Sequence, residues 1–125
     1  MLEKVIGKLK GEEVDYNLVD DDSATTINFG LELSFSNVNI EISYDKNEKL
    51  YRFYSELVQF NDDSYEDGAE LVNDINFNSL FVKAYLDDEN VLCIEYYSLN
   101  EFDSEMFDEL LNDTVSLEEL LEEYL

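Results

Sequence analysis

The chain has 125 residues, which is enough for one folded domain with a sizeable core. It carries 7 basic and 32 acidic residues, a net charge of −25, and its 45% hydrophobic content argues against intrinsic disorder. This charge excludes direct binding to nucleic acids and to anionic membranes, and it favours a protein partner with a basic surface.

The residue inventory also argues against catalysis. Histidine is absent and Cys93 is the only cysteine, so no histidine-based triad, thiolate metal cluster or intramolecular disulfide can form. Cys93 lies in an apolar strand pattern, which is typical of a small core residue. The run Asp20 to Asp22 lacks the spacing of a calcium loop, and no glycine-rich phosphate loop is present. We therefore expect no enzymatic activity, no cofactor and no metal.

The first half of the chain predicts a short helix followed by a sheet. Apolar residues recur at helical spacing over Leu2–Leu9, and Val14–Val19 favours a first strand. Strict alternation over Ile27–Phe35 and Val38–Tyr44 predicts two antiparallel strands with one packed and one solvated face. A tight turn is expected at Ser36–Asn37.

The next segment predicts a third long strand and a helix. Residues Leu50–Phe60 place apolar side chains on both faces, which indicates a central or covered strand. A helix with a stripe at 69, 71, 72 and 75 follows. It is expected to begin at Ser64, with Asp67 completing a capping box. Asn76 or Asn78 is expected to end it in the left-handed conformation, with Phe77 closing that end.

The last third predicts a hairpin and two helices. Leu80–Leu86 and Leu92–Tyr96 alternate about a turn at 87–90. Asp103 or Ser104 is expected to cap an amphipathic helix, and Ser116 with Glu119 predicts a capping box for a final short helix.

Together these elements predict a single α+β domain spanning residues 1–125. We expect an antiparallel sheet of five or six strands flanked by three or four helices. The sequence shows neither a signal peptide nor an apolar run of membrane-spanning length, so a cytoplasmic location is expected.

Two short segments carry a family resemblance. Glu70–Asn76 and Phe81–Asp88, read as a helix followed by a strand with the word Lys-Ala-Tyr-Leu-Asp, resemble the YbjN family of bacterial proteins. That family looks like the class I type III secretion chaperones, with a twisted antiparallel sheet flanked by helices. The resemblance implies a non-enzymatic, chaperone-like protein-binding module. It also implies homodimerisation, for which the 50–60 strand offers apolar residues on two faces.

The acidic residues near the C-terminus are the candidate partner-binding surface, because residues 84–125 contain no basic side chain. Such a surface, together with an apolar patch on the sheet or helices, fits a basic protein partner. The candidates are the acidic residues of the last two predicted helices and their approach: Glu101, Asp103, Glu105, Asp108, Glu109, Asp113, Glu118, Glu119, Glu122 and Glu123.

Three other interpretations of the acidic surface stay open. Carboxylates at phosphate-like spacing are typical of proteins that mimic nucleic acid, such as phage inhibitors of restriction or CRISPR enzymes. An acidic immunity protein that neutralises a basic nuclease would share this composition. The charge could also serve only solubility, with the acids forming the solvated faces of two helices.

Overall fold

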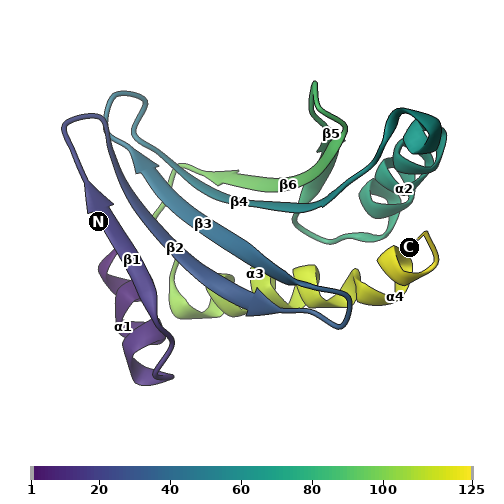
Figure 1. Cartoon of the computed structure of the whole chain (residues 1–125). Helices are drawn as coiled ribbons and strands as arrows, with labels where there is room; N and C mark the ends of the chain where they lie inside the picture. The colour runs from purple at the N-terminus through teal and green to yellow at the C-terminus, as the bar shows by residue number, and fades with distance from the viewer. Residues whose placement is uncertain (1, 125) are drawn as a thin grey trace.

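The computed structural model describes residues 2–124 and has the α+β architecture that the sequence predicts (Figure 1). Six strands form one antiparallel sheet in the order β1-β2-β3-β4-β6-β5. Their bounds are β1 Tyr16–Asp20, β2 Ala24–Glu32, β3 Asn37–Asp45, β4 Leu50–Gln59, β5 Lys83–Leu86 and β6 Val91–Ser98.

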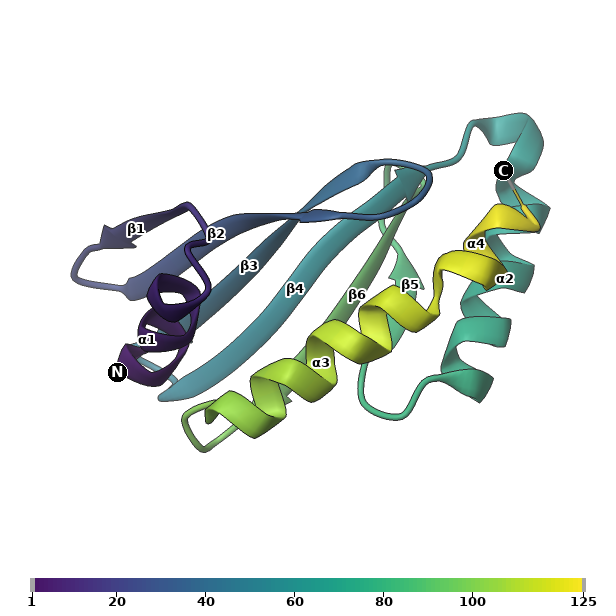
Figure 2. The same ribbon diagram turned by 90° about the horizontal axis from the view of Figure 1, so that it is seen from below.

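Most of the helices lie against one face of this sheet. The helices are α1 Glu3–Gly11, α2 Tyr65–Asn78, α3 Ser104–Ser116 and the short α4 Glu118–Glu122, with a 3₁₀ turn at Asp62–Ser64. Figures 1 and 2 show α1, α3 and α4 on the same side, while α2 stands at the end of the sheet beside β5. Within residues 2–124, no helix covers the opposite face.

Alternation along the strands builds the core between the sheet and the helices. In the β2–β3 ladder Ile27 pairs with Ile42 and Phe29 with Ile40, and all four side chains are buried. Phe107 of α3 packs its ring 5.7 Å from that of Phe29. The period-two pattern of the sequence thus selects the face that α3 covers.

The turn between β2 and β3 differs from the prediction. Glu32 pairs with Asn37, and the N–H of Leu33 donates to the carbonyl of Ser36, so the loop is residues 33–36 and not a two-residue turn at Ser36–Asn37. The strand ends early because Leu33 turns into the core and α4 holds Ser34 through side-chain hydrogen bonds.

The 50–60 strand is central, as predicted. β4 lies between β3 and β6, with a register shift between Glu56 and Val58. Its side chains toward the helices include buried Phe53, whereas Arg52 and Tyr54 lie on the open face. β4 therefore has a strand on each edge, while helices of the described chain cover only one of its two faces (Figure 1).

The expected helix ends are only partly confirmed. Ser64 is the N-cap residue of α2, as predicted, but its side chain makes no capping hydrogen bond; Asn61 instead accepts from the N–H of Ser64. The capping box at Ser116 is wrong, because α3 continues through Ser116. Neither Asn76 nor Asn78 has positive φ, and Phe77 is 88% exposed. The predicted cap at Asp103 is confirmed, since its carboxylate accepts from the N–H of Met106.

Among the described residues, no helix has the length and apolar character needed to cross a membrane.

Candidate partner-binding surface

The ten predicted acidic residues do not share one environment. In the first half of α3 and its approach, α1 supplies partial neutralisation: Lys8 lies 3.1 Å from Asp108, and Lys4 lies 3.9 Å from Glu101. The hydrogen bond that Lys8 donates to Asp108 raises the pKa of Lys8. Asp103 is exposed, but its carboxylate caps α3. Of this group, Glu105 is exposed and makes no ion pair or side-chain hydrogen bond with the described residues.

Two acidic residues of α4 hydrogen-bond that helix to the β2–β3 loop. Glu118 accepts from the N–H of Ser34 at 3.1 Å, and Glu122 accepts from the hydroxyl of the same residue. At the far end, the hydroxyl of Tyr124 donates to Asp74 of α2 at 2.7 Å, and this bond raises the pKa of Tyr124. α4 is therefore fixed between the β2–β3 loop and α2.

Asp113 is not part of an exposed acidic surface, contrary to the prediction. Its residue is only 7% exposed, and its carboxylate accepts backbone N–H groups from Leu80, Phe81 and Val82 at 3.3, 3.0 and 3.0 Å. Three donors satisfy the buried charge without a cation. Asp113 thus fixes the conformation of the α2–β5 loop (residues 79–82).

This loop exposes an apolar side chain that the sequence pattern placed in a strand. The alternation from Leu80 to Leu86 predicts a strand that includes Leu80, but β5 begins only at Lys83. Leu80 is 82% exposed, and Phe77, near the end of α2, is exposed beside it in sequence. Of the two, Leu80 also lines a hollow at the protein surface, which makes it the candidate for an apolar contact with a partner.

A groove runs beside Leu80 along α3 and α4. Its first part is a hollow of about 520 Å³ lined by Asn78, Leu80, Phe81, Glu109, Asn112, Asp113 and Ser116. Its second part is a hollow of about 270 Å³ lined by Asn78, Ser116, Leu117, Glu119, Leu120 and Glu123. Asn78 and Ser116 line both, so we treat them as one feature, the α2–α4 groove.

The groove combines apolar and acidic groups without a cation. Glu109, Glu119 and Glu123 are exposed, and within residues 2–124 none of the three forms an ion pair. No lysine or arginine lines either part. Glu105 shares this exposure and the lack of an ion pair within the described chain but lines neither part of the groove. Of the ten predicted acids, Glu109, Glu119 and Glu123 are thus the ones that bring exposed, uncompensated charge to the groove, as binding a basic partner requires.

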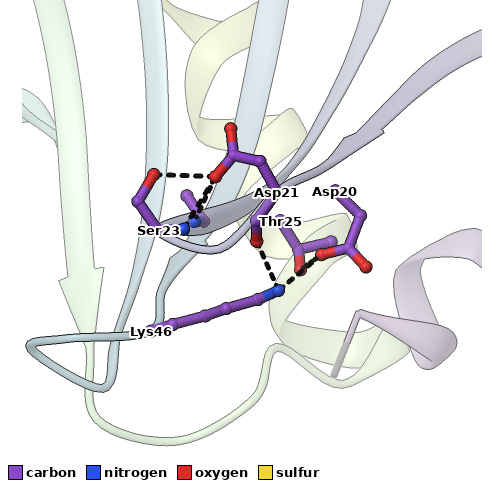
Figure 3. Close-up of polar contacts among 6 residues, drawn as sticks. Asp20, Asp21, Ser23, Thr25 and Lys46 are labelled. Atoms are coloured by element: carbon purple, nitrogen blue, oxygen red, sulfur yellow. Dashed lines mark hydrogen bonds and ion pairs between the residues drawn. The ribbon is translucent and has the colours of Figure 1, made fainter.

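The carboxylates of the β1–β2 turn serve the turn itself. Asp20 accepts from Lys46 at 2.7 Å and from Thr25, while Asp21 accepts from the N–H and hydroxyl of Ser23 (Figure 3). The hydrogen bond from Lys46 is the main cause that lowers the pKa of Asp20. The hydrogen bond from the Ser23 side chain is likewise the main cause that lowers the pKa of Asp21.

Three side chains with possible metal-ligand atoms lie close together on the open face of the sheet. One ligand atom each from Glu56, Asp87 and Cys93 lie within 4.8 Å of one another. The hydroxyl of Tyr54 donates to Glu56 and lies 3.4 Å from Sγ of Cys93. Burial raises the pKa of the Cys93 thiol, which favours the protonated form over the thiolate that metals bind. Tyr54 joins Glu56 and Cys93 by hydrogen bonds, while Asp87 accepts the N–H groups of Glu89 and Val91 in its own turn. The burial of Cys93 agrees with its predicted packing role.

Comparison with known proteins gives no family assignment. Neither the protein-family models nor the curated proteins include a match to this chain. What the chain binds is therefore argued from its own geometry.

Proposed function

We propose that this chain is a non-enzymatic protein-binding module whose partner presents a basic segment with an apolar anchor. The resemblance to the YbjN family favours the same class of function. The observation that carries the proposal is the α2–α4 groove, where exposed Leu80 and Glu109 line the first part and Glu119 and Glu123 line the second, with no cation among the described residues that line either part.

Each part of the groove has a distinct role in this proposal. An apolar side chain of the partner would cover Leu80, and burying one leucine contributes about 1.5–3 kcal/mol, which is roughly tenfold to a hundredfold in affinity. Glu109, Glu119 and Glu123 would attract lysine or arginine around that anchor. Exposed charges mainly accelerate encounter and select the partner, and salt weakens their effect.

The partner can be identified by capture from native lysate at low salt, followed by dissociation-constant measurements with the purified partner. We expect Leu80→Asp to weaken binding by about tenfold to a hundredfold or more. Replacing Glu109, Glu119 and Glu123 with Gln should weaken binding at low salt and flatten its salt dependence. The matched control neutralises Glu48, Asp88 and Glu89, exposed acids in two turns outside the groove, and should change affinity little.

The same measurements discriminate nucleic-acid mimicry. A mimic needs its carboxylates but not an apolar anchor. If Leu80→Asp leaves the affinity unchanged while DNA displaces the chain from its partner, the mimic interpretation replaces this proposal.

A further inference from the structure

The two edges of the sheet differ in whether their outward backbone groups are hydrogen-bonded. At the β5 edge, the side-chain amide of Asn76 donates to the carbonyl of Ala84 at 3.0 Å and accepts its N–H at 2.7 Å. Asp113 accepts the N–H of Val82, and the hydroxyl of Ser79 donates to the carbonyl of Val82. The outward backbone groups of Val82 and Ala84 are all satisfied, so this stretch cannot pair with another strand.

The β1 edge has no such cover. In the β1–β2 hairpin Asp21 donates its N–H to the carbonyl of Ala24, and the ladder pairs Val19 with Thr26 and Leu18 with Ile27. Hydrogen-bonded and non-hydrogen-bonded pairs alternate in an antiparallel ladder, so Leu18 and Tyr16 point their N–H and C=O groups outward. Within residues 2–124, no other segment bonds to these outward groups.

A hollow of mixed character adjoins this edge. Leu18 lies on the helix side of the sheet, is 49% exposed, and lines a space of about 360 Å³ with the apolar Leu2 and Ile6 and with the polar Glu3, Asp20, Thr25 and Lys46. Val19, on the other face, is 54% exposed. A strand added outside β1 would alternate its side chains across the two faces, and those on the helix side would meet Leu18 and Ile6.

The charge around β1 selects the kind of strand. Asp15, Asp21 and Asp22 are exposed and form no ion pair with the described residues, whereas Asp20 is already paired with Lys46 (Figure 3). A second copy pairing antiparallel about Leu18 would place Asp15 opposite Asp21 and bring together two chains of net charge −25. Like charges directly opposite are destabilising, so a basic strand fits this edge better than a second copy.

We propose that the outer edge of β1 accepts an extended, basic segment of a protein partner by strand addition. The segment alternates lysine or arginine with aliphatic residues, its backbone bonds to Tyr16 and Leu18, and its aliphatic side chains enter the hollow beside Ile6. This surface is separate from the α2–α4 groove and shares with the proposed function only the basic character of the partner.

The probe is a short synthetic peptide in which lysine alternates with valine, added to the uniformly ¹⁵N-labelled chain. We expect exchange of the Leu18 and Tyr16 amide protons to slow by about tenfold or more when the peptide binds. The same sequence with a fully N-methylated backbone keeps the charge and lacks the amide donors, and it should give no protection.

Two variants locate the effect. Leu18→Pro removes an outward N–H without removing a β1–β2 hydrogen bond, and should abolish protection at Tyr16. Leu80→Asp alters the groove alone and should leave protection unchanged, so failure at the edge is distinguishable from failure at the groove. If Leu18→Pro does not fold, the comparison of the two peptides on the unmodified chain still decides.

Three results would overturn the inference. One is protection by the N-methylated peptide equal to that by its parent, which would show attraction by charge alone. Another is a response confined to α3 and α4, which would locate binding in the groove. The third is a dimer of the unliganded chain in sedimentation that Leu18→Pro dissociates, which would make the occupant a second copy.

Discussion

The β5 end and the β1 end of the sheet meet the same physical problem in opposite ways. Both are edges with outward backbone groups. At β5, Asn76 and Ser79 satisfy those groups from the chain just before the strand, and Asp113 does so from α3. At β1, the outer groups of Tyr16 and Leu18 receive no bond from the rest of the described chain. The difference separates a rigid end, which carries the groove, from an end that another strand can extend.

The closed end also shows that an acidic residue can act within the fold. Asp113 and Glu109 lie one turn apart on α3, yet Asp113 accepts three backbone N–H groups while Glu109 is exposed on the wall of the groove. The net charge of −25 is therefore not one uniform surface, and only part of it is available to a partner.

The largest effect is expected from breaking the closed end at Asp113. Asp113→Ala should lower the free energy of unfolding by about 3 kcal/mol, because buried N–H groups of the α2–β5 loop lose a charged acceptor. Urea denaturation measures this change. Glu109→Ala, the matched exposed acid, should change the free energy by less than about 0.5 kcal/mol. Equal effects of the two substitutions would show that Asp113 does not support the loop.

A smaller effect is expected at Asn76. Asn76→Ala removes both hydrogen bonds to Ala84 and should lower the free energy of unfolding by about 1–2 kcal/mol. It should also accelerate amide exchange at Ala84. Leu18→Thr at the β1 edge introduces a β-branched residue, which strands favour, and should cost less than Asn76→Ala. If it costs more, β1 is not the free edge described above.

The smallest effect concerns the ion pair at the β1 end. Lys46→Met should raise the pKa of Asp20 toward its usual 3.8, because the hydrogen bond from Lys46 is the main cause of its lowering. With the folded pKa depressed, the stabilisation by this pair is fully present above pH 3.8 and is lost as the pH falls through the folded value.

Carboxyl ¹³C titration by NMR measures this pKa. Asp21 is the internal control, since its pKa is lowered mainly by Ser23 and should move less. An unchanged Asp20 in the Lys46→Met variant would contradict the pairing drawn in Figure 3.

The sheet could be predicted from the sequence where alternation is strict, as in the paired Ile27 and Ile42. What could not be predicted depends on contacts between distant residues. Asp113 and Val82 are separated by the whole β5–β6 hairpin and most of α3, and nothing local distinguishes Asp113 from Glu109. Leu80 continues an alternating pattern, yet the bonds to Asp113 hold it in a loop before β5 begins.

The predicted capping box at Ser116 is wrong for a similar reason. A serine followed three residues later by an acid satisfies the capping-box pattern at Ser116, but α3 runs through that position and its hydroxyl donates to the carbonyl of Asp113. Of the candidate surface, the acidic helices were found from charge alone. The groove required Leu80, whose exposure no periodicity indicates.

The most direct test of the central claim is the dissociation constant of the purified partner for the unmodified chain and for Leu80→Asp, measured at low and high salt. The account predicts that Leu80→Asp weakens binding by about tenfold to a hundredfold or more at both salt concentrations, because the loss at the anchor is mainly apolar. An unchanged affinity for Leu80→Asp would contradict the assignment of the α2–α4 groove as the partner-binding site.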